Sequence, residues 1–213
     1  MIQAVIFDMD GILFDTERLG LTQQLQACRD VGFPVTEELL MRTLGINMAA
    51  GREIMMGALG PDFPYERMIG RWTERMYEYM AVSGIPQKTG IREMMKALHD
   101  RGIKAGVATS NNRTIVENYM KLAGLDRAFE AVVCGDSVQK SKPAPDIFLA
   151  AAKKLGMEPS KCMGVEDSIN GVKAVRAAGM VCVMVPDLIP FTRELSVYVD
   201  HCVPTLQDII PLL

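Results

Sequence analysis

The chain has 213 residues, of which 49% are hydrophobic and 23% are charged, and its formal net charge is −3. This composition is typical of a globular protein with a sizeable core, and the lack of a basic excess argues against a nucleic-acid partner. Five cysteines stand apart without a C-x-x-C pair, so we expect free thiols in a reducing compartment. Without a signal peptide or a membrane-spanning apolar run, we expect a cytoplasmic protein with no membrane partner. We also expect a monomer.

The first predicted strand, residues 5–7, runs straight into two acids in the stretch FDMDG. Residues two apart in a strand point to the same side, so Asp8 and Asp10 would share a face if strand geometry continued to Asp10. Open α/β sheets bind ligands at this carboxyl end of their strands. Two adjacent carboxylates repel each other, so a cation or a proton must accompany them. By itself, the pair is equally compatible with two solvated loop acids.

Residues 16–81 show helical periodicity and no strand, which indicates a helical block inserted after the first strand. We therefore predict a core domain of residues 1–15 and 82–213 and an inserted α-helical domain of residues 16–81. A turn region from Gly45 to Gly51 lies inside the insert and precedes Arg52. Arg52 is a candidate substrate contact, although a solvated helix arginine is the commoner occurrence.

Beyond the insert, short apolar strands alternate with amphipathic helices, which predicts a parallel sheet with helices on both faces. We expect strands at 103–108, 131–134, 162–165 and 181–185, and helices at 91–100, 115–123, 146–155 and 169–178.

Polar residues follow the second and third of the predicted strands. Thr109, Ser110 and Asn111 precede a predicted helix. The N-terminus of a helix is a natural anion-binding site, although Ser, Thr and Asn are also common helix caps. Further along, we expect Pro143 to be the first residue of a helix. Lys142 would then lie at the positive end of the helix dipole, which is favourable only if the lysine faces an anion.

The fourth strand ends in Glu166 and Asp167, and Ser168 is the expected cap of the next helix. One edge of the sheet would then gather four acids, a lysine and a hydroxyl: Asp8, Asp10, Glu166, Asp167, Lys142 and Thr109. This excess of negative charge calls for a divalent cation, and hard oxygen ligands with room for water suit Mg²⁺. No histidine lies in these motifs, so we do not expect zinc.

Together, the stretches FDMDGILFDTE, ATSNN, SKPAPDIF and GVEDSINGV resemble the four motifs of the haloacid dehalogenase-like hydrolase superfamily. They are most similar to its β-phosphoglucomutase and sugar-phosphate phosphatase branch. The resemblance covers essentially the whole chain. It implies a Rossmann-like α/β core and a small α-helical cap domain inserted after the first strand.

The resemblance also implies catalytic roles. Asp8 would be the nucleophile that forms an aspartyl-phosphate, and Asp10 would act first as general acid and then as general base. Thr109 would hydrogen-bond a phosphoryl oxygen, helped by the Ser110 amide and by Asn111.

In the same pattern, Lys142 would neutralise Asp8 and the phosphoryl group. The Mg²⁺ ion would be bound by the Asp8 carboxylate, the Asp10 backbone carbonyl and Asp167. Glu166 would be a further ligand, either directly or through water.

The inserted block contains arginines but no lysine. The β-phosphoglucomutase pattern has a lysine where this chain has Leu44 and a histidine where it has Gly20. We therefore expect water to be the phosphoryl acceptor. The prediction is a Mg²⁺-dependent phosphatase acting on a small phosphorylated metabolite, a sugar or polyol phosphate. A phosphomutase is the alternative, and a non-catalytic phospho-receiver is a third reading that the helical insert disfavours.

Overall fold

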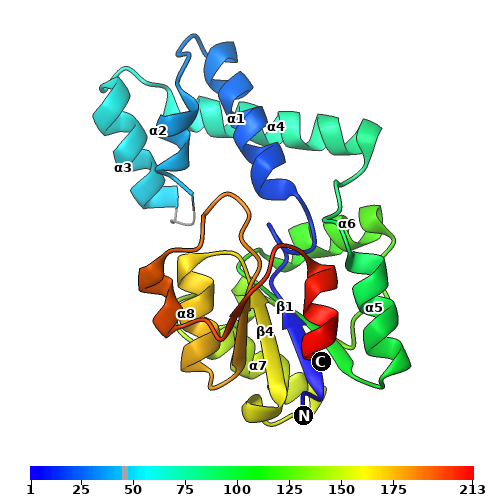
Figure 1. The fold of residues 1–213 in the computed structure, drawn as a ribbon. Helices are drawn as coiled ribbons and strands as arrows, with labels where there is room; N and C mark the ends of the chain where they lie inside the picture. The colour runs from blue at the N-terminus through cyan, green and yellow to red at the C-terminus, as the bar shows by residue number, and fades with distance from the viewer. Residues whose placement is uncertain (45–47) are drawn as a thin grey trace. The chain divides into compact units, whose positions relative to one another are not determined.

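The computed structural model describes residues 1–44 and 48–213, so Gly45 of the predicted turn lies outside the described residues. The chain divides into two compact units, Met1–Asp15 with Ile85–Leu213, and Thr16–Gly84 (Figure 1). The predicted boundary at residue 81 lies within a helix that continues to Ser83. Among the described residues, no helix has the length and apolar character that a membrane crossing requires.

The described part of the second unit is helical. Its helices are α1 (Thr16–Asp30), α2 (Glu37–Met41), α3 (Met48–Leu59) and α4 (Tyr65–Ser83). Helix α1 packs along α4, and Trp72 Nε1 donates to the Gly20 carbonyl over 3.0 Å. At the end of α1, Asp30 Oδ2 accepts from Arg71 at 2.8 Å and from Arg75 at 3.0 Å. These contacts join the two longest helices of the unit.

The first unit contains a parallel sheet in the order β3-β2-β1-β4-β5-β6. Its strands are β1 (Ala4–Phe7), β2 (Lys104–Thr109), β3 (Ala131–Cys134), β4 (Cys162–Glu166), β5 (Val181–Met184) and β6 (His201–Cys202). The predicted fold class is confirmed. The sequence did not predict β6, because two exposed residues at a sheet edge form no apolar run.

Helices cover the sheet. Helices α7 (Asp146–Leu155) and α8 (Ile169–Ala177) share one buried cluster with Ala4 and Ile6 of β1. Val5 and Phe7 are equally buried and alternate with them, so they point to the opposite face. Helix α5 (Ile91–Asp100) packs against β2 and against a C-terminal 3₁₀ helix, Leu206–Leu212.

The predicted helix at 146–155 is confirmed, and the expectation that Pro143 is the first residue of this helix is wrong. Helix α7 begins at Asp146, because its first backbone bond runs from the Leu149 N–H to the Pro145 carbonyl over 3.0 Å. Lys142 therefore lies in the turn before the helix, and the dipole argument for its position does not hold. Side-chain contacts determine where its ammonium group lies.

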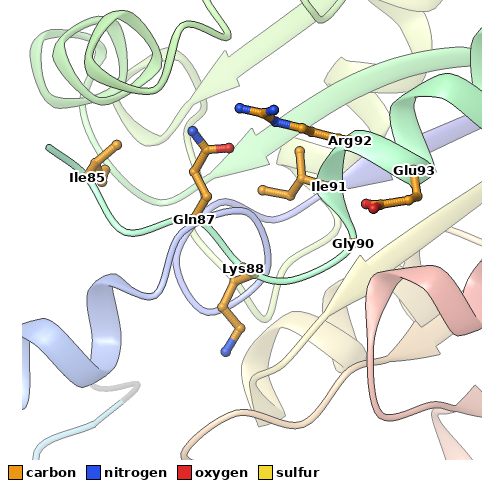
Figure 2. Close-up of a pocket in the computed structure, with 7 residues that line it drawn as sticks. All are labelled: Ile85, Gln87, Lys88, Gly90, Ile91, Arg92 and Glu93. Carbon is orange, nitrogen blue, oxygen red and sulfur yellow. The ribbon is translucent and has the colours of Figure 1, made fainter.

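A pocket of about 380 Å³ lies on the first unit, and seven residues of the segment 85–93 line it (Figure 2). Gln87 and Lys88 point to opposite sides of this segment. Lys88 Nζ lies 2.9 Å from Asp187 Oδ1 and 3.5 Å from Asp15 Oδ1. The pocket lining includes none of the predicted site residues. Sequence patterns did not reveal the ion pairs of Lys88, because Lys88, Asp15 and Asp187 come from three separate loops.

Close packing of α8 on the sheet depends on Gly164 in β4. A β-carbon at this position would lie 2.6 Å from both methyl carbons of Val175. We expect Gly164→Ala to lower the free energy of unfolding by about 1–3 kcal/mol, as overpacked core substitutions do. Urea unfolding measures this change. In a Val175→Ala background the same substitution should cost much less, and an equal cost in both backgrounds would contradict the overlap.

Candidate active site

The site forms where three neighbouring strands end. Strand β1 lies between β2 and β4, with Phe7 opposite Val107 on one side and Val165 on the other. The Asp8 N–H donates to the Val165 carbonyl over 2.9 Å, so the sheet pairing continues one residue past β1. This pairing places the Asp8 carboxylate beside the end of β4, where Glu166 ends the strand.

Lys142 binds two carboxylates at once. Its Nζ lies 2.6 Å from Asp8 Oδ1 and 2.6 Å from Glu166 Oε1. The lysine side chain is 7% exposed, and that of Glu166 is fully buried. Two short charge-assisted hydrogen bonds therefore compensate the burial of this ammonium group.

Glu166 is held on both oxygens. Besides the Lys142 bond on Oε1, its Oε2 accepts from the Asp167 N–H at 3.0 Å and from the N–H and Oγ of Ser168 at 3.1 and 3.0 Å. A β-carbon at Gly171 would lie 1.8 Å from Glu166 Cδ, so glycine is needed there. Ser168 also caps α8, as predicted, by accepting the Gly171 N–H at 3.0 Å.

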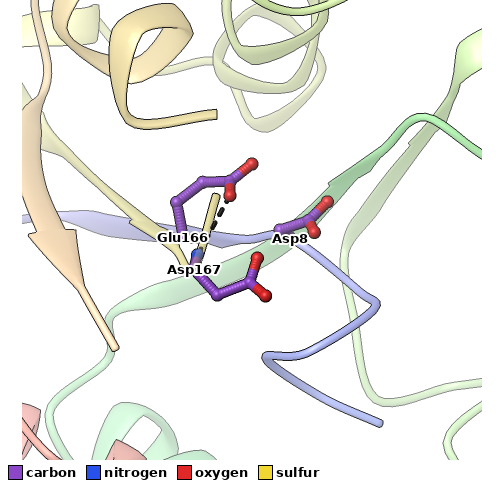
Figure 3. A group of neighbouring side chains, drawn as sticks. All are labelled: Asp8, Glu166 and Asp167. Atoms are coloured by element: carbon purple, nitrogen blue, oxygen red, sulfur yellow. Dashed lines mark hydrogen bonds between the residues drawn. The ribbon is translucent and has the colours of Figure 1, made fainter. Parts of the chain in front are cut away.

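A carboxylate cluster able to hold a metal ion is present at this edge (Figure 3). One oxygen each of Asp8, Glu166 and Asp167 lies within 4.8 Å of the others. Hard oxygen donors in such a group fit Mg²⁺. Both Glu166 oxygens already accept hydrogen bonds, which makes this carboxylate less suited to direct coordination of a metal ion.

The electrostatics of the cluster are dominated by burial. Burial raises the pKa of Asp8 to about 8; the Lys142 charge opposes this shift, and the Glu166 and Asp10 charges add to it. Burial also disfavours the charged form of Lys142, but Asp8 and Glu166 outweigh it and raise the lysine pKa. Lys142 thus stays cationic near neutral pH, while Asp8 needs another cation nearby to ionise readily.

The segment at the end of β2 contains the predicted site residues Thr109, Ser110 and Asn111. Thr109 is 1% exposed, and its Oγ1 accepts the Asn111 N–H at 3.2 Å. Asn111 Nδ2 donates to Asp10 Oδ2 over 2.6 Å, so its side chain contacts a carboxylate. Ser110 is exposed. The structure thus brings together Asp10, Asn111 and Thr109 from two adjacent strands.

Arg52 lies in α3 of the helical unit. Its guanidinium carbon is 6.0 Å from the centroid of the Tyr65 ring, and its Nε lies 3.4 Å from Glu66 Oε1. The Arg52 side chain is 54% exposed. These contacts belong within its own unit, and the substrate contact stays a prediction.

Comparison with known proteins identifies relatives along most of the chain. The family model described as "haloacid dehalogenase-like hydrolase" matches residues 5–185. YhcW of Bacillus subtilis (strain 168), a candidate phosphatase, is 32% identical in an alignment that covers 98% of this chain and 94% of YhcW.

Two further matches come from Thermotoga maritima. Its phosphorylated carbohydrates phosphatase is 33% identical over 178 residues, 84% of this chain and 82% of its own. A crystal structure described as a candidate β-phosphoglucomutase superposes with a TM-score of 0.83 at 29% identity, covering 99% of this chain and 98% of that one. These matches confirm the resemblance that the four motifs indicate.

The raised pKa of Asp8 predicts how the stability of the metal-free protein depends on pH. Between the unfolded pKa of about 4 and the folded value of about 8, the folded state binds the extra proton. The contribution of Asp8 to the free energy of unfolding therefore falls as pH rises from 5 to 8. We expect the melting temperature in EDTA to fall by several degrees over this range, and less in Asp8→Asn. A pH dependence that is identical in the variant would contradict this assignment.

Proposed function

Because this chain belongs to the haloacid dehalogenase-like hydrolase family, we propose that it is a Mg²⁺-dependent phosphatase working through an aspartyl-phosphate. The observation that supports this most is the Lys142 ammonium group between Asp8 and Glu166, 2.6 Å from each. A cation held against a buried carboxylate can stabilise the charge of a phosphoryl group that arrives there.

The chemistry follows from the two aspartates. The Asp8 carboxylate attacks the phosphorus atom, the ester bond breaks, and Asp10 protonates the departing alcohol oxygen. Asp10 then removes a proton from water, which attacks the phosphorus and releases inorganic phosphate. This second step restores both carboxyl groups. Thr109, at the end of the neighbouring strand, hydrogen-bonds a phosphoryl oxygen.

The carboxylates of Asp8 and Asp167 and the backbone carbonyl of Asp10 would hold the Mg²⁺ ion. When bound, the ion supplies positive charge that favours the Asp8 carboxylate and offsets the phosphoryl charge. Glu166 acts mainly by anchoring Lys142, because its oxygens accept bonds from that lysine and from Ser168.

The proposed substrate is a small sugar or polyol phosphate. Support comes from the relative named as a phosphorylated carbohydrates phosphatase. The similarity to a candidate β-phosphoglucomutase keeps a phosphomutase as the second candidate. Against it stands Gly20, which occupies the position where the β-phosphoglucomutase pattern has a histidine.

The test is phosphate release from a panel of sugar and polyol phosphates, with Mg²⁺ and with EDTA. We expect release with Mg²⁺, its loss in EDTA, and a fall of about 10³-fold or more in Asp8→Asn, because the nucleophile is gone. Asp126→Asn makes the same chemical change at a side chain that is 57% exposed, and should leave the rate unchanged.

Each candidate function has its own outcome in this assay. Release that survives in Asp8→Asn would contradict the nucleophile assignment. Interconversion of hexose phosphates without release would favour the mutase. No turnover of any substrate would favour a phospho-receiver.

A further inference from the structure

The side chain of Asn111 lies against the proposed general acid. Its Nδ2 donates to Asp10 Oδ2 over 2.6 Å. A bond this short to a carboxylate is typical of a charge-assisted hydrogen bond, and it restricts the orientation of the carboxyl group. The family resemblance implies a phosphate contact for this residue instead.

The backbone of Asn111 is fixed on both sides. Its N–H donates to Thr109 Oγ1 at 3.2 Å, and its carbonyl accepts the Gly135 N–H at 2.8 Å. A β-carbon at Gly135 would lie 2.2 Å from the Ser110 carbonyl oxygen, so only glycine allows this approach of β3 to the loop. The amide therefore reaches Asp10 from a loop that is held in place, as positioning requires.

We propose that Asn111 is a positioning residue that orients the Asp10 carboxyl group, and that it does not bind the phosphoryl group. This inference rests on the proposed phosphatase function. An amide nitrogen donates and does not accept, so it holds Asp10 Oδ2 as an acceptor. The proton that passes to the departing alcohol oxygen is then carried on Oδ1, and a new proton from the attacking water replaces it there. Asp10 thus enters each proton transfer already aligned.

The next residue provides a matched control. Asn112 has the same side chain, but it is exposed, and its Oδ1 accepts the Ile115 N–H at 3.0 Å as the cap of α6 (Arg113–Ala123). Asn112→Ser keeps an oxygen that can cap the helix. Comparing variants of these two adjacent asparagines therefore separates an effect on the orientation of Asp10 from an effect on helix capping.

The experiment compares two leaving groups. For a sugar phosphate, whose alkoxide needs a proton, we expect Asn111→Ala to lower kcat/KM about 10- to 100-fold. For p-nitrophenyl phosphate, whose phenolate leaves without a proton, kcat/KM should change less than about threefold. The inhibition constant of inorganic phosphate should stay unchanged. Asn112→Ser should leave all three quantities as in the wild type.

Other outcomes would overturn the proposal. Equal losses for both substrates, with weaker inhibition by phosphate, would make Asn111 a phosphoryl ligand. Unchanged turnover of the sugar phosphate would remove the role altogether. Crystal structures of the wild type and of Asn111→Ala with Mg²⁺ test the contact without turnover: a turned Asp10 carboxyl group in the variant supports the proposal, and an unmoved one overturns it. If the wild type hydrolyses no phosphate ester, the proposed function fails, and the structures still decide whether Asn111 orients Asp10.

Discussion

The Lys142 ammonium group lies 2.6 Å from carboxylate oxygens on two adjacent strands, Asp8 after β1 and Glu166 at the end of β4. Removing such charges from water costs several kcal/mol each unless they are paired and hydrogen-bonded. The sheet brings the two carboxylates together, and the positive charge of Lys142 offsets their mutual repulsion. The remaining negative charge, from Asp10 and Asp167, is what makes this edge of the sheet suited to a divalent cation.

Glycines make the site compact enough for these contacts. A β-carbon at Gly171 would overlap Glu166, and one at Gly11 would lie 2.1 Å from Asp167 Oδ2. Gly11 also has a φ of +76°, a backbone conformation that other residues rarely adopt. The tight turn at Gly11 and the close approach of Gly171 in α8 to Glu166 therefore allow the acids to lie near enough to bind one ion.

The two neighbouring asparagines show how the backbone divides roles between identical side chains. Asn111 points to Asp10, and Asn112 caps α6. Their chemistry is the same, and the loop between β2 and α6 decides which one faces the carboxylates. A short loop that is fixed by Thr109 and Gly135 thus connects the β2 end to the proposed acid and base.

The sequence by itself determined the parallel α/β sheet, its helices and the residues gathered at its carboxyl edge, because apolar periodicity and polar strand ends are local signals. It did not determine that Lys142 lies between Asp8 and Glu166, that β6 pairs at the edge, or that Asn111 contacts Asp10. These features depend on groups far apart in the chain: Lys142 and Asp8 are separated by 134 residues, and Asn111 and Asp10 by 101. Such contacts exist only after the strands have packed side by side, so only the tertiary structure could decide them.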